Sequence, residues 1–398
     1  MSMSHESVSN GTFRGFISHH DAREFWLLCV ATFLCFLTLS QTALLSVILS
    51  ERGVPVESVG IVLASYGVTV TAFSLVSGPL ANRIGTLHTL QLGMALLLIA
   101  HLSYHFTIGS LTGAITSRLL QGAGFGLFLA SAMAFATGKL APERIVYLLG
   151  IYASMVQLPN ALGPPLAKLY LDHYGSGFFF LAGALPALLA LPLTTGMQDR
   201  VVKISHSRNT TLTKTAADPK LRLPLIAILV VGTMLGLVPS YMAPLLIDKE
   251  VPIACFFSVY PVTAFVSRFV LMAWIERWPR WQTLCAGFAF MSIAYAGLAA
   301  TDNALVVIAL AILFGLGSSV SYPTLSACVS DLFDAGNKAM PLAVFNTAFN
   351  LGLFLTPLSA GYIIAFGGYH LSLLLLAGGS ALIALTIIAK RSRIEALT

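Results

Sequence analysis

Residues 196–222 read GMQDRVVKISHSRNTTLTKTAADPKLR, a polar stretch with six basic residues and no apolar periodicity. Long apolar runs lie on both sides of it, so it divides the chain into two halves, as an inter-domain linker does. We therefore predict five parts. They are a tail at 1–22, a first helical bundle at 23–196, the linker at 197–222, a second bundle at 223–390 and a tail at 391–398.

The composition of the flanking halves excludes a water-soluble protein. Hydrophobic residues make up 57% of the 398 residues and charged residues 10%, and the mean hydropathy is +0.85. Soluble globular proteins carry roughly a quarter charged residues, and so few charges cannot cover a soluble surface of this size. The chain is predicted to be an all-α membrane protein that crosses the bilayer many times.

The apolar runs predict twelve membrane-spanning helices, six on each side of the linker. A hydrocarbon core about 30 Å thick needs roughly 20 apolar residues per helix. The runs that meet this length are 25–50, 58–81, 88–107, 110–137, 145–171, 176–196, 223–247, 251–275, 282–301, 304–331, 340–364 and 369–390.

The distribution of Lys and Arg predicts the orientation. Cytoplasmic loops of membrane proteins carry an excess of these residues. With both termini in the cytoplasm, most of the 22 basic residues fall on that side, whereas Arg52 and Lys249 fall outside. We expect a multi-pass protein of the plasma (inner) membrane. The same asymmetry explains the net charge of +6 without a nucleic-acid partner.

Three short motifs and one internal repeat lie in the predicted helices and turns. The first is Gly78-Pro-Leu-Ala-Asn82-Arg83-Ile-Gly85, and Glu276-Arg277 lies at the equivalent turn of the second half. The second is Arg118-Leu-Leu-Gln121-Gly122, and the third is Asn160-Ala-Leu-Gly163-Pro164. Glycines recur in the fourth run of each half, where they allow helices to approach closely.

These motifs, in this order, resemble those of the major facilitator superfamily over essentially the whole chain. The resemblance implies twelve transmembrane helices in two pseudo-symmetric six-helix bundles, a substrate site near the membrane midplane and transport by alternating access. It implies a gating role for Gly78, Asn82, Arg83, Gly85, Glu276 and Arg277. It also implies a structural role for Gln121, Gly122, Gly163 and Pro164.

The first motif departs from the family pattern. Asn82 stands where the family has an acid, and Thr86 stands where it has a second basic residue. An amide can hydrogen-bond a helix end but gives up the ionic interaction. We therefore expect a weaker inner gate, with Glu276 and Arg277 contributing more of it.

Two arginines lie within predicted spans, and no acidic residue lies in the middle of a span. A charge at bilayer depth costs at least a few kcal/mol and usually serves a function. Because arginine matches a carboxylate in a bidentate way, we predict an organic anion as substrate, with Arg268 the first candidate and Arg118 the second. The alternative is that both donate to carbonyls and amides and that the substrate is neutral or cationic.

Uncharged polar groups in the spans supply the rest of a candidate cavity. Buried amides and phenols must find partners, either on other helices or in a wet cavity. The candidates for substrate binding are Gln41, Gln157, Asn160, Tyr241, Tyr260, Tyr322, Asn346 and Asn350. His101 and His105 share one helix face, and we interpret them as an interfacial pair rather than a metal site.

The function predicted from these residues is secondary active transport of a small organic anion, either a carboxylate or a polycarboxylate chelator. No nucleotide-binding loop, catalytic cluster or cofactor site is expected, so the chain is not predicted to be an enzyme. A multidrug exporter and a metal or metallophore carrier are alternatives within transport, and a receptor or intramembrane enzyme is the alternative outside it. The expected partners are the substrate, the lipid bilayer and a coupling proton or counter-substrate, with a monomeric protein.

The linker allows a test of the orientation. A cysteine introduced as Ser207→Cys should react with a membrane-impermeant maleimide only after cells are permeabilised, because the basic linker is predicted to be cytoplasmic. Labelling of Ser207→Cys in intact cells would show that the topology is inverted.

Overall fold

The N-terminal half forms the helices expected from its apolar runs. The computed structural model describes residues 19–138, 145–198, 215–270, 278–333 and 338–391. The helices of this half are α1 (His19–Ser40), η1 (Gln41–Leu44), α2 (Leu45–Glu51), α3 (Val56–Ile84), α4 (Thr86–Thr107), α5 (Leu111–Gly138), α6 (Ile145–Tyr174) and α7 (Phe179–Thr195). The first predicted run therefore consists of α1, a short 3₁₀ turn and α2.

The C-terminal half has a similar order of helices. Its helices are α9 (Arg222–Leu237), the π-helical turn η3 (Val238–Met242), α10 (Ala243–Asp248), α11 (Ala254–Phe257), α12 (Val259–Val270), α14 (Arg280–Ala300), α15 (Ala304–Asp331) and α16 (Ala339–Ala389). Its first run is interrupted at η3, and its second run is interrupted between α11 and α12. The last two predicted runs lie in α16, which Gly367 and Gly368 interrupt with non-helical dihedral angles. Gly368 has φ +71°, a conformation that favours glycine.

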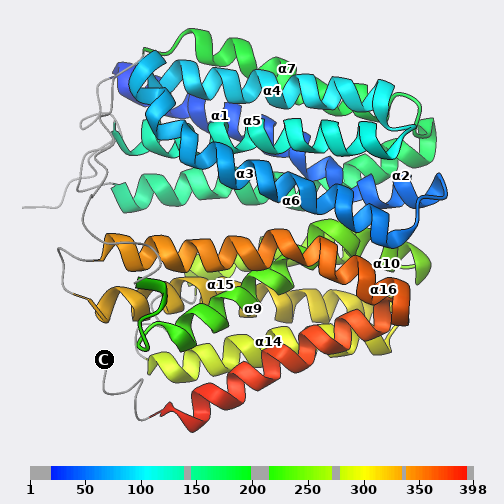
Figure 1. Ribbon diagram of the computed structural model, residues 1–398, viewed down its shortest axis with the longest axis vertical. Coiled ribbons are helices and arrows are strands. Elements are labelled where there is room, and N and C mark those ends of the chain that lie inside the picture. Colours follow the sequence, from blue (N-terminus) through cyan, green and yellow to red (C-terminus); the bar gives the residue numbers. More distant parts are fainter. Residues whose placement is uncertain (1–18, 139–144, 199–214, 271–277, 334–337, 392–398) are drawn as a thin grey trace, which may run out of the picture.

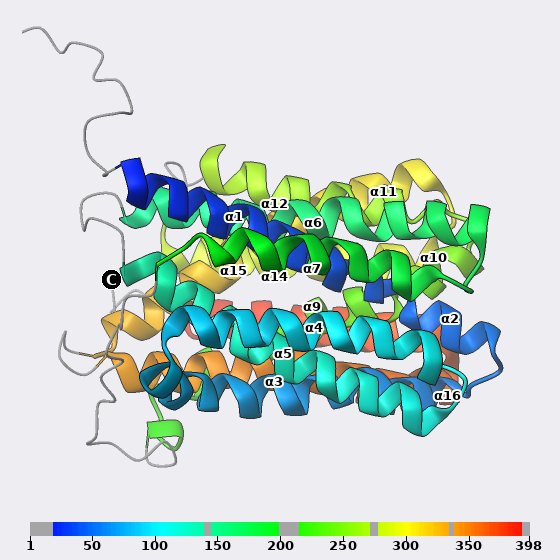
Figure 2. The same cartoon turned by 90° about the horizontal axis from the view of Figure 1, so that it is seen from above.

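The two halves form two bundles that lie side by side, blue to green and green to red in Figure 1, and Figure 2 shows them from above. We call the end where α1 begins and α16 ends the terminal face, and the end where α2 ends the distal face. Eight of the described helical segments are long and apolar enough to cross a membrane. The remainder of the predicted run 251–275, together with Glu276 and Arg277, lies outside the described residues.

The same glycine contact occurs once in each bundle. A Cβ added at Gly124 of α5 would lie 2.8 Å from the carbonyl oxygen of Gly93 of α4. A Cβ added at Gly317 of α15 would lie 2.5 Å from the carbonyl oxygen of Gly287 of α14. Both helix pairs therefore approach through paired glycines, as predicted, because any side chain there would meet backbone atoms.

The glycine contact predicts a stability difference between two Gly→Ala variants. Gly124→Ala should lower the free energy of unfolding by about 1–3 kcal/mol, because the new methyl group meets the backbone of α4. Gly379→Ala is the control, because a Cβ there meets nothing within 4 Å. Thermal unfolding in detergent should separate the two, and equal stability of both variants would contradict this packing.

Candidate functional site

A cavity of about 250 Å³ lies between the two bundles. The N-terminal bundle contributes side chains from α1, α3, α5 and α6, and the C-terminal bundle contributes side chains from η3, α11, α12 and α16. Its polar lining includes Arg118, Tyr66, Asn160, Ser240 and Tyr260. We call this space the central cavity. A site formed by both bundles can change its exposure when the bundles move relative to one another.

Arg118 is the charged residue that lines the central cavity. Arg118 is only 8% exposed, and its guanidinium carbon lies 4.5 Å from the centroid of the Tyr66 ring. Nη1 donates to Oε1 of Gln121, whereas Nε has no hydrogen-bond partner. No described carboxylate forms an ion pair with Arg118. The cavity wall thus carries a buried cation, one of whose donors, Nε, is buried without a partner.

A hydrogen-bonded network lies behind Arg118 and joins three helices of the N-terminal bundle. Gln121 Oε1 also accepts from the hydroxyl of Tyr104, at 3.4 Å, and Gln121 Nε2 lies 3.3 Å from His101 Nε2. His101 Nε2 lies 3.1 Å from the carbonyl oxygen of Thr38 on α1, and its Nδ1 lies 3.0 Å from that of Leu97 on α4. The network fixes the position from which Gln121 holds Arg118.

The two histidines do not form the interfacial pair that the sequence predicted. His101 is only 1% exposed, because α1 and α5 cover it, whereas His105 is half-buried and its Nδ1 lies 3.0 Å from the carbonyl oxygen of Gly177. The shared helix face therefore holds one buried and one peripheral ring. In the described parts of the chain, no group of three or more His, Cys, Asp or Glu residues is placed to hold a metal ion.

Aromatic side chains join the bundles at the central cavity. Phe354 of α16 packs over Gly67 of α3. A Cβ added at Gly67 would lie 2.1 Å from the Cβ of Phe354. Its ring lies edge-on to Tyr66, with the centroids 5.8 Å apart. Phe125 stacks on Tyr66 at 5.9 Å, and Phe257 lines the opposite wall. Apart from Arg118, the cavity is therefore largely apolar and aromatic.

The structure separates the predicted substrate-binding residues into two groups. Arg118, Asn160 and Tyr260 line the central cavity, as does Pro164, which was predicted to be structural. Arg268, the first candidate from sequence, is exposed on α12 and does not line this cavity. The geometry thus favours Arg118 over Arg268.

The other candidate residues contact neighbouring helices instead. Gln157 lines a separate pocket of about 100 Å³ between α6 and α12. The side-chain amide of Gln41 packs over Gly183 of α7. A Cβ added at Gly183 would lie 2.2 Å from Oε1 of Gln41. Tyr322 donates to Asn346, joining α15 to α16, and Asn350 is half-buried and away from the central cavity.

Tyr241 closes the distal side of the central cavity. Its hydroxyl lies 3.2 Å from the carbonyl oxygen of Val56 in the N-terminal bundle and 3.1 Å from that of Pro357 in the C-terminal bundle. A Cβ added at Gly60 would lie 2.6 Å from the Pro357 oxygen, so α3 and α16 are in backbone contact here. The bundles are therefore held together on this side.

The predicted gating motif forms the turn between α3 and α4 on the terminal face. Gly85 has φ +97° and ends α3, and its N–H donates to the carbonyl oxygen of Ala81 at 2.9 Å. Asn82 and Arg83 are exposed, and Gly78 is half-buried within α3. No described residue forms an ion pair with Arg83.

The two structural glycines of the remaining motifs lie at close helix contacts. A Cβ added at Gly122 of α5 would lie 2.3 Å from the carbonyl oxygen of Tyr66 on α3. A Cβ added at Gly163 of α6 would lie 1.7 Å from Oγ of Ser40 on α1. These contacts set the positions of Tyr66 and Ser40 at the cavity wall.

Tyr66 and Phe354 are cavity residues that the sequence analysis missed. Tyr66 and Tyr260 occupy equivalent positions of the two repeats, because the carbonyl of Tyr66 faces Gly122 and the carbonyl of Tyr260 faces Gly315. The internal repeat could have revealed Tyr66 once Tyr260 was chosen. Phe354 had no such signal, since it is one of 25 phenylalanines in apolar runs.

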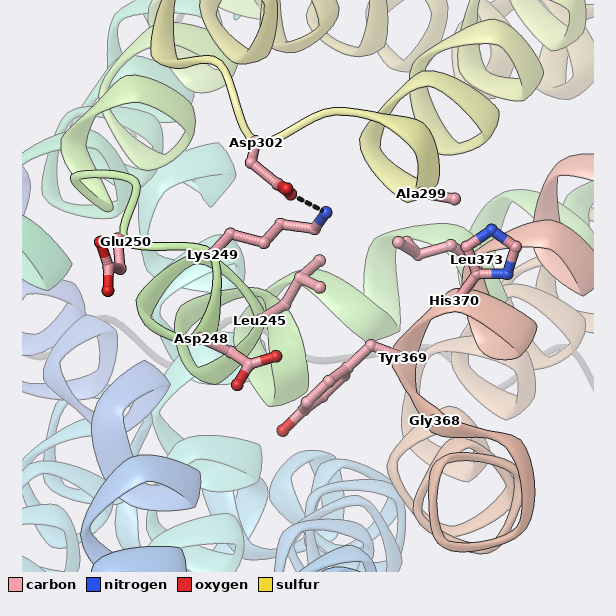
Figure 3. A pocket seen from close by; sticks show the side chains of 10 residues that line it. All are labelled: Leu245, Asp248, Lys249, Glu250, Ala299, Asp302, Gly368, Tyr369, His370 and Leu373. Atoms are coloured by element: carbon pink, nitrogen blue, oxygen red, sulfur yellow. Dashed lines mark hydrogen bonds and ion pairs between the residues drawn. The ribbon is translucent and has the colours of Figure 1, made fainter.

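A second, larger pocket of about 660 Å³ lies at the distal face (Figure 3). Lys249 crosses it to Asp302, at 2.5 Å, and also donates to the carbonyl oxygen of Thr301 at 3.0 Å. Asp248 and Tyr369 lie on its other side. All of its lining residues belong to the C-terminal bundle, so movement between the bundles would not expose it alternately to two sides.

Two apolar helical bundles with a buried cavity between them define a multi-pass membrane transporter. A model of the Major Facilitator Superfamily matches residues 26–254 and 223–396. The chain belongs to this superfamily.

Individual relatives are transporters or resistance proteins. The staphylopine export protein of Staphylococcus aureus is 22% identical over 342 residues, which is 79% of this chain and 84% of that protein. A methylenomycin A resistance protein of Streptomyces coelicolor is 27% identical over 152 residues, 38% of this chain and 31% of that protein. A solved peptide transporter POT has the same fold, with a TM-score of 0.79 and 14% identity over 97% of both chains.

The distal contact predicts a change in accessibility. In a cysteine-free background, a Thr42→Cys probe in the central cavity should react about fivefold faster with an impermeant reagent from the distal side when Tyr241→Phe is added, because one hydrogen bond contributes about 1 kcal/mol.

The matched control is Tyr295→Phe, which removes a buried hydrogen bond to the carbonyl oxygen of Met234 within the C-terminal bundle. It should leave the labelling rate unchanged. If both variants accelerated labelling equally, general loosening would explain the effect and Tyr241 would have no special role in closure.

Proposed function

We propose that this protein is a secondary transporter of a small organic anion, which binds Arg118 in the central cavity. The observation that carries the proposal is the buried guanidinium, which lines the cavity, keeps a free Nε donor and has no described carboxylate partner. Leaving a buried charge unpaired is costly, so a substrate anion is the natural counter-charge. A carboxylate can accept two parallel hydrogen bonds from such a group.

The composition of the cavity wall favours a monoanion with an apolar body over a polycarboxylate chelator. Arg118 is the one cation among the described residues that line the cavity, so a second and third carboxylate would enter a largely apolar space without a described counter-charge. Phe36, Phe125 and Phe257 offer apolar contact area to a ring or aliphatic chain. The cavity of about 250 Å³ lies just below the usual range for drug-sized ligands, which favours a small molecule.

The contacts between the bundles support the proposal that transport occurs by alternating access. Tyr241, Gly60 and Phe354 join the bundles around the cavity and toward the distal face, so opening that face requires these contacts to separate. If the terminal face is cytoplasmic, as the basic residues predict, the distal contacts form the outer gate. An anion bound to Arg118 would contact Tyr260 or Ser240 of the other bundle, and so favour their approach.

Efflux of an uncharged drug-like compound is the second candidate. The aromatic cavity wall favours it, and the relative from Streptomyces coelicolor is a methylenomycin A resistance protein. The staphylopine export protein likewise moves its substrate outward, as its name states. Arg118 opposes a cationic substrate in either case, because like charges repel in a medium of low dielectric constant.

Charge-matched probes distinguish these functions. Purified protein should bind phenylacetate more tightly than its neutral analogue phenylacetamide and more tightly than citrate. Arg118→Gln should weaken phenylacetate binding by about 10- to 150-fold, the equivalent of the 1.5–3 kcal/mol contributed by a hydrogen bond to a charged group. Arg118→Lys should retain partial affinity, because it keeps the charge but loses the fork. Isothermal titration calorimetry measures the affinity of the unmodified protein for each of the three ligands and that of the two variants for phenylacetate.

Arg268→Gln is the matched control, because it removes an arginine that does not line the central cavity. It should bind phenylacetate as the unmodified protein does. Equal binding of phenylacetate and phenylacetamide would contradict the anion proposal and favour the uncharged substrate. Loss of phenylacetate binding in Arg268→Gln but not in Arg118→Gln would move the site to α12.

A further inference from the structure

The network behind Arg118 contains a buried titratable ring that anion binding itself does not require. The two nitrogens of His101 lie 3.0 Å from the carbonyl oxygen of Leu97 and 3.1 Å from that of Thr38. A carbonyl oxygen only accepts hydrogen bonds, and a neutral imidazole has one N–H. The neutral ring therefore donates to one of the two carbonyls, whereas the protonated ring donates to both.

Gln121 links this ring to the anion site. Its Nε2 lies 3.3 Å from His101 Nε2, and its Oε1 accepts from Arg118. In the neutral ring with its proton on Nδ1, Nε2 can accept from the amide of Gln121. In the protonated ring, Nε2 must donate, and the carbonyl of Thr38 is the acceptor within reach. Protonation of His101 thus excludes the tautomer in which Nε2 accepts from the amide of Gln121.

Among the residues that the structure describes, one fixed charge lies in the surroundings of His101. Arg118 faces it from α5, and the titratable Tyr104 lies one turn away on α4, with ring centroids 6.2 Å apart. From α1 the ring meets the carbonyl of Thr38, with Cys35 the nearest titratable residue along that helix, and α7 carries no ionisable side chain. Tyr66 of α3 lies beyond Arg118.

We propose that His101 is the proton-binding site of this transporter and that it takes up a proton when an anion occupies Arg118. Two positive charges joined through one amide repel each other, and a bound anion neutralises the first of them. The proton passes from water to a ring nitrogen, and no other bond changes. Since coupling between two sites is reciprocal, a proton on His101 also tightens anion binding. Anion and proton therefore cross the membrane in the same direction.

This inference rests on the proposed anion function, but its first test needs no ligand. Histidine side chains labelled with ¹³C are titrated by NMR, and the His101 signal among the nine histidines is identified by its loss in His101→Gln. Arg118→Gln removes the opposing charge, so the midpoint of the His101 titration should move upward by about one to two pH units. Arg118→Lys keeps the charge and should therefore move the midpoint of the His101 titration less than Arg118→Gln does.

The second test counts protons. Phenylacetate binding is measured by calorimetry between pH 6 and pH 8.5 in two buffers that differ in ionisation enthalpy, a range in which the probe stays ionised. The unmodified protein should take up a measurable fraction of a proton per anion, increasing toward the lower pH, and should bind more tightly there. His101→Gln should take up none. His105→Gln, which alters the half-buried ring on the same helix, should keep the uptake.

The outcomes separate the two proposals. Absence of phenylacetate binding overturns the anion function, while the NMR comparison still decides whether the charge on Arg118 controls His101. Binding without proton uptake, or uptake that persists in His101→Gln, overturns the proton site and leaves the anion function intact. Identical His101 titrations in Arg118→Gln and the unmodified protein overturn it as well.

Discussion

The positive charge of Arg118 is the constraint on which the rest of the site depends. A guanidinium in a membrane-spanning helix requires solvent or a counter-charge. The contact of Arg118 with the Tyr66 ring and its hydrogen bond to Gln121 leave Nε without a hydrogen-bond partner. Gln121 can serve Arg118 because Tyr104 and His101 hold the amide in place. The arginine therefore explains the polar network on its protein side, and on its cavity side it is the basis of the proposal that the substrate is an anion.

Helix packing places that charge where both bundles meet. Gly122 lets α5 approach α3 closely enough for Arg118 to stack on Tyr66, and Gly67 admits Phe354 from the other bundle onto the same ring. In lipid, such close contacts replace the hydrophobic driving force that packs soluble helices. The aromatic ring of Tyr66 thereby contacts both the charged group and Phe354 of the C-terminal bundle, so the anion site and the interface between the bundles share one side chain.

The spans were predictable from sequence because membrane thickness and apolar run length determine them, and the arrangement in two bundles was predicted from the linker and from the resemblance of three motifs to a known superfamily. The apolar runs correspond to the described helices, and the glycine repeats lie at the expected contacts. The site was harder, since apolar helices give no periodicity that distinguishes lipid from protein. The sequence ranked Arg268 before Arg118, and the packing of α5 against α3 and the exposure of α12 reverse that order. His101 was misplaced for the same reason, because nothing in its own helix reveals that α1 covers it.

The closure by Tyr241 uses backbone carbonyl oxygens as its acceptors, those of Val56 and Pro357. Every amino acid supplies the same carbonyl, so this contact places no demand on the side chains opposite the tyrosine. Substitutions can accumulate at residue 56 without weakening it, provided that α3 keeps its position. This distal contact is therefore tolerant of sequence drift on one side and dependent on a single hydroxyl on the other, and homologous chains could lose side-chain similarity around it while retaining the contact.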